Sequence, residues 1–111
     1  MKALKLEDWD ETPQDYTGIV EWKCGNKSWV KNGKHHRENG PAHIKKIGYK
    51  IWYLDGKYVW DSHAKLGLTN QIILSKTQHP LYPTVQVWKI LDKDRVWQQI
   101  VIPGMEKYIQ E

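Results

Sequence analysis

Short stretches of apolar and aromatic residues, separated by turn sequences, run along most of the chain, which is typical of an all-β protein. Residues 28–31 and 51–54 each lead into a dipeptide, Asn32-Gly33 and Asp55-Gly56. A two-residue type I′ turn needs positive φ at both central residues, which Asn, Asp and Gly tolerate. Each stretch is therefore predicted to be the first strand of a β-hairpin.

The two hairpins are copies of one internal repeat. Residues 25–34 (GNKSWVKNGK) align with residues 48–57 (GYKIWYLDGK) at an offset of 23 positions, with Gly, Lys, Trp, Gly and Lys shared in register. An offset of this size indicates stacked supersecondary units. With two-residue loops we expect these facing pairs: Lys31–Lys34, Val30–His35, Trp29–His36 and Ser28–Arg37, then Leu54–Lys57, Tyr53–Tyr58, Trp52–Val59 and Ile51–Trp60.

This register divides the side chains between two faces, because successive residues of a strand point to opposite sides. Trp29 and Trp52 share one face, which we predict to be the core. The opposite face is expected to carry polar residues in the first hairpin and aromatic or apolar residues in the second: Ser28, Val30, His35 and Arg37, then Ile51, Tyr53, Tyr58 and Trp60.

The rest of the chain predicts a β-rich C-terminal half. Strands are expected at 71–75, 85–91 and 96–102, with a turn at 92–95, a proline-containing loop at 79–83 and short helical turns at 63–66 and 105–110. We therefore expect one all-β domain over residues 1–111: an antiparallel meander of hairpin repeats, then a C-terminal β-hairpin with one or two short helices. Its parts are an acidic N-terminal arm (1–15), the hairpin repeats (16–60) and the C-terminal half (61–111).

Charge is distributed unevenly along the chain. The net charge is +4, but residues 1–22 carry −4, residues 23–57 carry +7 and residues 58–111 carry +1. A dense basic block indicates an anionic partner such as a phosphate, a nucleotide, a nucleic acid or an acidic protein surface. The alternative is that lysines on exposed strands protect sheet edges from aggregation. Seven Trp and six Tyr with no Phe suit binding faces and a thin β-core equally well.

Several function classes are disfavoured by the residues present. No apolar run approaches the ~20 residues of a membrane span, and the acidic N-terminal residues predict no signal peptide. Cys24 is the only cysteine, so we expect no intrachain disulfide and a reducing, cytoplasmic setting. His36, His43 and Cys24 match no standard zinc spacing, and no phosphate-binding P-loop is present. We expect no metal, no cofactor and no enzyme activity.

Residues 32–42 (NGKHHRENGPA) and 52–57 (WYLDGK) resemble the MORN-like hairpin repeats of many small bacteriophage-encoded proteins. The first copy is close to the repeat pattern, whereas Tyr58-Val-Trp-Asp61 replaces its polar residues in the second. The resemblance implies a β-meander without enzyme activity that acts in the bacterial host cytoplasm. It also implies an accessory phage protein of the kind that antagonises host defence.

The basic and aromatic residues of the hairpins are the candidate ligand site. Arg37 offers a planar fork for phosphate and His35 a further donor. A bound anion would relieve the repulsion between Lys31 and Lys34, which are expected to face each other across the first hairpin. The candidate residues are Lys31, Lys34, His35, Arg37, Tyr53, Tyr58 and Trp60, of which the last three would stack a base. In a purely structural interpretation, Arg37 pairs with Glu38 and His36 packs beside Trp29.

Three functions follow from these residues. The first is sequestration of a nucleotide-type immune signal of the host. The second is inhibition of a host defence complex through a Trp- and Tyr-rich protein interface, since both residue types are common at interface hot spots. Direct nucleic-acid binding ranks third, because the acidic arm weakens the positive field. Exposed strand edges would also allow self-association into a homo-oligomer.

Overall fold

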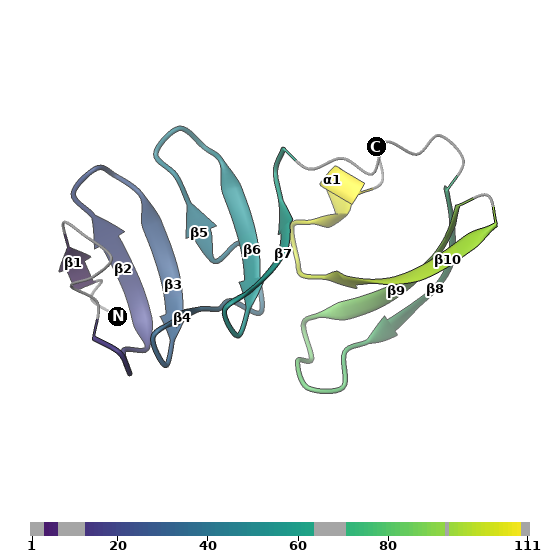
Figure 1. The fold of residues 1–111 in the computed structure, drawn as a ribbon, viewed down its shortest axis with the longest axis horizontal. Coiled ribbons are helices and arrows are strands. Elements are labelled where there is room, and N and C mark those ends of the chain that lie inside the picture. The colour runs from purple at the N-terminus through teal and green to yellow at the C-terminus, as the bar shows by residue number, and fades with distance from the viewer. Residues whose placement is uncertain (1–3, 7–12, 64–70, 93, 110–111) are drawn as a thin grey trace.

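The computed structural model describes residues 4–6, 13–63, 71–92 and 94–109, which form ten strands and one short helix in two sheets (Figure 1). The first sheet contains β1 (Leu4–Leu6), β2 (Gly18–Trp22), β3 (Lys27–Lys31), β4 (Lys34–His35), β5 (His43–Ile44), β6 (Lys50–Leu54) and β7 (Lys57–Asp61). The second contains β8 (Gln71–Gln78), β9 (Gln86–Asp92) and β10 (Arg95–Val101), followed by α1 (Glu106–Ile109). The expected all-β class is confirmed.

The first sheet is an antiparallel meander with one parallel strand at its edge. Its order is β1-β2-β3-β5-β6-β7, with β4 beside β3. The parallel strand comes from the acidic arm, where Leu4 pairs with Val20 and Leu6 with Trp22. The sequence pattern did not predict this strand, because three residues are too few to show a period. Part of the arm thus belongs to the sheet.

Both hairpin turns have the expected geometry. Asn32 and Gly33 have φ values of 50° and 77°, and Asp55 and Gly56 have 49° and 79°. These positive values at both central residues identify type I′ turns. The pairs nearest each turn are also as predicted: Lys31–Lys34, Val30–His35, Leu54–Lys57 and Tyr53–Tyr58.

Farther from the turns, the predicted register is wrong in both hairpins. In the first, Ser28 pairs with His43 of β5 instead of Arg37, because the chain leaves the sheet after His35. In the second, Trp52 pairs with Trp60 and Ile51 with Asp61. Val59 is the extra residue of a β-bulge, which shifts every later residue to the other face. Trp60 therefore lies on the face of Trp52 and not with Tyr58.

The second sheet has the order β10-β9-β8. The expected C-terminal hairpin is β9–β10, and the strand expected at 71–75 is β8, which pairs with β9. β8 extends past the predicted residue 75 to Gln78. The predicted loop at 79–83 is present and α1 lies within the predicted 105–110. The helical turn expected at 63–66 falls, apart from His63, outside the described residues. No helix in the described ranges is long and apolar enough to cross a membrane.

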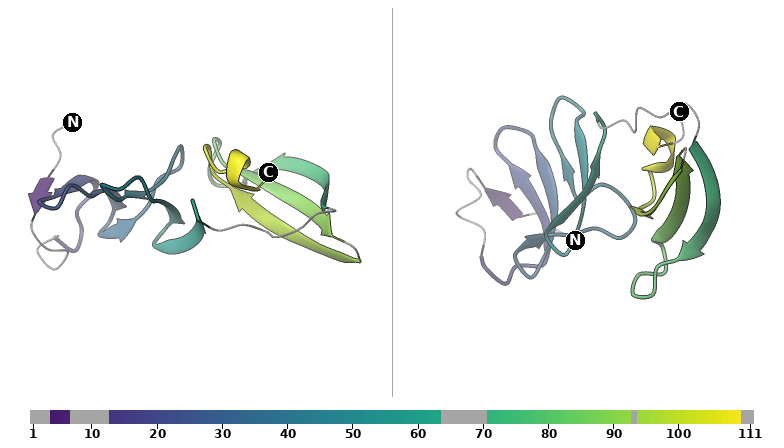
Figure 2. Two further views of the ribbon diagram at one scale, coloured as in Figure 1. Left: turned by 90° about the horizontal axis from the view of Figure 1, so that it is seen from above. Right: turned by 45° about the vertical axis from the view of Figure 1, so that its right-hand side comes forward.

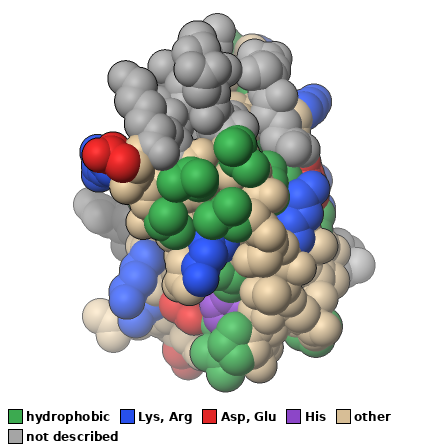
Figure 3. All heavy atoms as spheres, turned by 90° about the vertical axis from the view of Figure 1, so that its right-hand side faces the viewer, with side chains coloured by type: hydrophobic (Ala, Val, Ile, Leu, Met, Phe, Trp, Pro, Cys, Tyr) green, Lys and Arg blue, Asp and Glu red, His purple; other side chains and the backbone are tan. Residues whose placement is uncertain are grey.

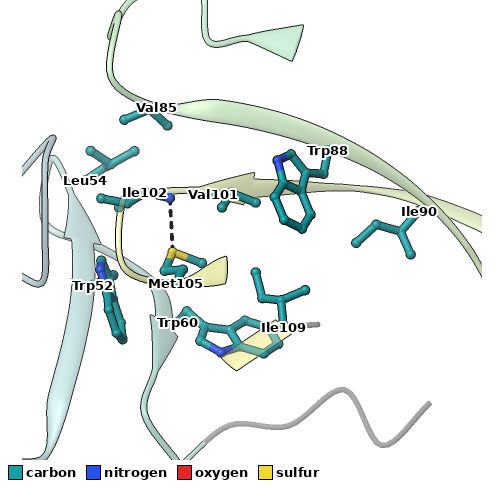
Figure 4. Close-up of a cluster of buried hydrophobic side chains, with 10 residues drawn as sticks. All are labelled: Trp52, Leu54, Trp60, Val85, Trp88, Ile90, Val101, Ile102, Met105 and Ile109. Carbon is teal, nitrogen blue, oxygen red and sulfur yellow. Dashed lines mark hydrogen bonds between the residues drawn. The ribbon is translucent and has the colours of Figure 1, made fainter. Parts of the chain in front are cut away.

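The hydrophobic core lies where the two sheets meet (Figure 4). The first sheet supplies only three of its side chains, from β6 and β7, and the remainder follow residue 84: Trp52, Leu54 and Trp60, with Val85, Trp88, Ile90, Val101, Ile102, Met105 and Ile109. The sheets lie side by side along the longest dimension of a 46 × 30 × 20 Å molecule (Figure 2). The core position predicted for Trp52 is confirmed, whereas Trp29 is only half-buried and lies outside this cluster.

Candidate functional site

A loop of residues 36–42 interrupts the strand position between β3 and β6. β4 and β5 fill the two ends of this position, and the chain leaves the sheet between them. Backbone hydrogen bonds hold the loop at its base: His36 N donates to Trp29 O (2.9 Å), Arg37 N to Tyr53 O (3.2 Å) and Ala42 N to Ile51 O (2.9 Å). The loop is therefore anchored on both neighbouring strands.

Inside the loop, the imidazole of His36 is buried between two acidic residues. The backbone N–H of Asp55 donates to His36 Nδ1 (2.9 Å), and His36 Nε2 lies 2.9 Å from Glu38 Oε2. Because a backbone amide can only donate, Nδ1 is the acceptor and Nε2–H donates to the Glu38 carboxylate. The structural interpretation of the sequence paired Glu38 with Arg37 and placed His36 beside Trp29. In the structure Glu38 pairs with His36 instead.

The guanidinium of Arg37 lies over the indole ring of Trp29, with its carbon 3.8 Å from the ring centroid. Its Nε donates to Asn39 Oδ1 and its Nη1 to Pro41 O, both at 3.1 Å. Gly40 lies so close that a Cβ there would be 3.0 Å from the guanidinium carbon. The guanidinium thus fits between the Trp29 ring and Gly40, and burial lowers its pKa.

An open concavity of about 420 Å³ lies beside this arrangement, within the range of roughly 300–1,000 Å³ that small-molecule sites occupy. It is lined by Thr17, Gly18, Ile19, Trp29, Val30, Lys31, His36, Arg37 and Asn39. Lys27 Nζ lies 5.2 Å from the centroid of the Trp29 ring. Lys27, Lys31 and Arg37 form no ion pair within the described part of the chain. We call this concavity with its three cations the Trp29 cleft.

The residues predicted for one ligand site are divided among separate places. Lys31 and Arg37 belong to the Trp29 cleft, whereas Trp60 is in the core. Lys34 packs its side chain beside Gly56 at the hairpin tips. On the opposite face, His35 stacks on Tyr53 with centroids 4.9 Å apart, and Tyr53 meets Tyr58 edge-on at 6.3 Å. Arg37 and the tyrosines therefore cannot bind one small ligand together.

The opposite face contains a buried hydroxyl group with three ring partners. Ser28 Oγ lies 2.7 Å from His43 Nδ1 and 3.2 Å from His35 Nε2, and it accepts from Trp22 Nε1 at 3.2 Å. Burial, followed by the charge of His43, lowers the pKa of His35 to about 4. Burial and then Lys45 also lower the pKa of His43. A Ser–His contact resembles a nucleophile and its base, but Ser28 is fully buried, which keeps a substrate from its hydroxyl.

The loop preceding β9 fixes the 36–42 loop against the second sheet. Tyr82 donates its hydroxyl hydrogen to Asp55, which raises the pKa of Tyr82 to about 12 and lowers that of Asp55. Thr84 donates to the backbone carbonyl of Glu38. These contacts hold the Trp29 cleft in a defined position relative to the core.

Another concavity, of about 410 Å³, lies at the β1–β2 edge and is lined by Lys5, Leu6, Glu21, Trp22 and Lys23. The Glu21 carboxylate makes it less suited to an anion than the Trp29 cleft. Among the described residues, no group of three or more His, Cys, Asp or Glu is placed to hold a metal ion. His36 and His43, two members of the zinc set considered from the sequence, have separate partners, Glu38 and Ser28.

The sequence reasoning missed Trp29 itself, together with Lys27 and Asn39. For Trp29 the repeat offset contains a partial signal, because it aligns Trp29 with Trp52 and Arg37 with Trp60, and the structure pairs the two residues of each repeat. Comparisons with protein-family models, curated proteins and solved structures found no match. Any assignment of function therefore depends on the geometry of the sites.

Proposed function

We propose that this protein is a non-enzymatic binding protein that takes up a nucleotide-type ligand in the Trp29 cleft. The observation that supports the proposal is that Lys27, Lys31 and Arg37 lie at the Trp29 cleft and that none of them forms an ion pair with a carboxylate of the described residues. Glu21 is the cross-strand neighbour of Lys27, and Lys31 acts on Asp55 only through its charge. Cations left without a counterion on a surface attract an anion, and an arginine fork is well matched to phosphate.

The two parts of such a ligand have separate places in the cleft. The phosphate groups bind the ammonium of Lys31 and the guanidinium edge of Arg37, whose fixed orientation lowers the entropic cost of binding. Nε and Nη1 of Arg37 already donate to Asn39 and Pro41, which fixes the guanidinium and leaves Nη2 to donate to the phosphate. The base rests on Ile19 and on the part of the Trp29 ring that Arg37 leaves uncovered. A base stacked on an aromatic ring contributes about 1–3 kcal/mol, whereas a micromolar dissociation constant needs about 8 kcal/mol. The contacts to the phosphate groups must therefore supply most of the affinity.

The biological setting is proposed from the MORN-like resemblance of residues 32–57. A phage protein that binds a nucleotide in the host cytoplasm, and lacks catalytic groups to consume it, would act by sequestration. The ligand class that fits both the cleft and this setting is a nucleotide-type signal of a host defence system. The expected effect is suppression of the response that the signal triggers.

Binding is tested by titrating the protein with linear and cyclic nucleotides while following its melting temperature and its calorimetric heat. We expect a saturable rise in melting temperature with particular nucleotides, and none with adenosine, which lacks phosphate. Lys31→Ala and Arg37→Ala should each weaken binding about tenfold or more, the effect of one lost charge-assisted hydrogen bond.

Lys57→Ala is the matched control, because Lys57 is an exposed lysine of the same sheet outside the cleft. It should bind as the wild type does. The proposal fails if no nucleotide in the panel shifts the melting temperature, or if the two cleft variants bind as tightly as Lys57→Ala.

Inhibition of a host defence complex is a second candidate, and exposed apolar side chains on the second sheet favour it. Ile72, Leu74 and Val96 are 57%, 48% and 53% exposed, although all three lie in or beside strands. Figure 3 shows hydrophobic side chains gathered at this end of the molecule with basic side chains next to them. Apolar groups in such an arrangement are typical of protein interfaces.

The second candidate predicts a stable complex with a host protein that survives nuclease treatment. Ile72→Glu should abolish the complex, whereas Leu81→Glu should retain it, because Leu81 is 74% exposed on the separate loop before β9. If the wild type, Ile72→Glu and Leu81→Glu all captured the host protein equally, this surface would not be its binding site. A steep dependence of DNA or RNA binding on salt would instead support the nucleic-acid hypothesis.

A further inference from the structure

One buried hydroxyl group holds both ends of the 36–42 loop. His35 directly precedes the loop and His43 directly follows it, and both imidazoles contact Ser28 Oγ, at 3.2 Å and 2.7 Å. Ser28 is fully buried in β3. We call Ser28, His35 and His43 the Ser28 clasp. It closes a loop whose own residues position Arg37 on Trp29.

A count of donors and acceptors shows that only one of the two ring nitrogens facing Ser28 Oγ, His35 Nε2 or His43 Nδ1, can carry a hydrogen. The hydroxyl has one hydrogen to donate and two lone pairs, and Trp22 Nε1–H occupies one lone pair. One imidazole must therefore accept from the hydroxyl while the other donates to it. A proton added to the accepting nitrogen would leave three donors around two lone pairs and a buried hydroxyl hydrogen without an acceptor.

Burial and neighbouring basic groups also oppose added positive charge at the clasp. Lys45, after β5, lowers the pKa of His43, and burial together with His43 lowers the pKa of His35 to about 4. From β6, Tyr53 stacks on His35 as a neutral ring. From β7, Tyr58 meets Tyr53 and donates its hydroxyl hydrogen to Asp61. Both histidines are thus held in their neutral forms.

We propose that the Ser28 clasp is an acid-sensitive device: protonation of its histidines opens the 36–42 loop and withdraws Arg37 from the Trp29 cleft. Arg37 moves with the loop because both of its hydrogen-bond acceptors, Asn39 and Pro41, belong to the loop. The effect on ligand binding rests on the proposed function, whereas the opening of the loop does not.

The direction of the pH dependence follows from the lowered pKa values. An unfolded histidine has a pKa near 6.5, so between pH 6.5 and about 4 the unfolded chain binds more protons than the folded one. The clasp stabilises the loop fully above pH 6.5. Its contribution is lost progressively as the pH falls toward 4.

The test is hydrogen exchange at pH 7.5 and pH 5, with rates corrected for the intrinsic effect of pH. The reporters are the amides at the base of the loop, those of His36, Arg37 and Ala42. Their protection should fall about tenfold or more, the change that one unit of pKa difference produces. The β9–β10 amides should keep theirs.

The variant H35Q/H43N separates titration from structure, because Gln and Asn place amide groups near the positions of Nε2 and Nδ1 but do not ionise. It should show the same loop protection at both pH values, while His63→Gln, which alters a histidine outside the clasp, should behave as the wild type does. If the double variant is unstable, His43→Asn alone should reduce the pH response without abolishing it, because His35 remains buried and still titrates. An unchanged response in these variants would overturn the proposal, as would full loop protection of the wild type at pH 5.

A second experiment measures the affinity for ATP, used as the probe, at pH 7.5 and pH 5. Wild-type affinity should fall more steeply than that of H35Q/H43N between pH 7.5 and pH 5. If ATP does not bind at any pH, the proposed function loses support, but hydrogen exchange still decides whether the clasp opens. If ATP binds and both proteins show the same pH profile, the clasp does not regulate the cleft.

Discussion

Trp29 and Trp52 occupy equivalent positions in the two repeats and lie on the same face of the same sheet, yet their surroundings differ. Trp52 is 1% exposed, donates from Nε1 to Pro103 O (3.1 Å) and belongs to the core. Trp29 is half-buried beneath the guanidinium of Arg37. The residue that covers each Trp follows it by eight positions: Trp60 follows Trp52, and Arg37 follows Trp29.

The difference shows how one repeat can serve two purposes. In the second copy, Trp60 extends the apolar surface of Trp52, so the second sheet and α1 can pack against it. In the first copy, Arg37 covers the ring but retains a charge, which prevents a dry contact with another layer. One substitution at a repeat position thus separates a core-forming unit from one with a charged, half-exposed surface.

Exchanging Trp60 and Arg37, the residues that cover the two Trp rings, should give the largest effect on stability. Trp60→Arg places a cation at a site that is 8% exposed and surrounded by apolar side chains. An uncompensated buried charge costs about 3–5 kcal/mol, so the free energy of unfolding should fall by about that amount in urea denaturation. Arg37→Trp should change it by less than about 1 kcal/mol, since the new ring can still cover Trp29.

Trp60→Phe is the control for this exchange. Among the described residues, Trp60 Nε1 is the buried side-chain donor that has no hydrogen-bond partner. Phe keeps most of the ring and removes that donor, so we expect a change within about 1 kcal/mol. Equal destabilisation by Trp60→Arg and Arg37→Trp would show that the two repeats do not differ in the way described.

The same comparison shows what the sequence could predict. Turn dipeptides determine local geometry, so both type I′ turns and the pairs beside them were predicted correctly. The bulge at Val59 and the departure of the chain after His35 were not, because each is decided by contacts with residues distant in sequence. The predicted place of Trp60 in the candidate site was wrong for the same reason: the extra residue Val59 moves Trp60 to the face of Trp52.

The basic character of the site was predictable, but its assembly was not. Charge counting located the basic block that contains Lys27, Lys31 and Arg37. That Arg37 lies on Trp29 depends on Gly40, whose close approach to the guanidinium no periodic pattern reveals. Ser28, a small polar residue in a predicted strand, gave no indication that it joins two histidines.

Two glycines, Gly104 against the Trp52 ring and Gly40 against the Arg37 guanidinium, should show a smaller difference in stability than the exchange of Trp60 and Arg37. Gly104 has φ +94° and follows Pro103 in the turn that holds Trp52, and a Cβ there would lie 3.4 Å from the ring. Gly104→Ala should cost about 2 kcal/mol because of its left-handed backbone. Gly40 has no such φ, so Gly40→Ala should cost about 1 kcal/mol of stability.

The two glycine variants should also differ in binding. Gly40→Ala forces the guanidinium of Arg37 from its place on Trp29, so it should weaken nucleotide binding, whereas Gly104→Ala should leave affinity unchanged at temperatures where it is folded. Calorimetry with ATP beside urea denaturation measures both properties. Unchanged affinity in Gly40→Ala with weakened affinity in Gly104→Ala would contradict the assignment of binding to Trp29 and of core packing to Trp52.

The smallest effect is expected from the lysines that lie over Trp rings on either side of the comparison. Lys27 Nζ is 5.2 Å from the Trp29 centroid, and Lys76 Nζ is 4.2 Å from that of Trp88 in the core. Exposed cation–π contacts contribute about 0.5–1 kcal/mol, so Lys27→Ala and Lys76→Ala should both lower stability only slightly. Lys27→Ala should in addition reduce ATP affinity and flatten its dependence on salt, because it removes a cation from the Trp29 cleft. If Lys76→Ala reduced affinity equally, the attraction would come from the net charge of the molecule and not from the cleft.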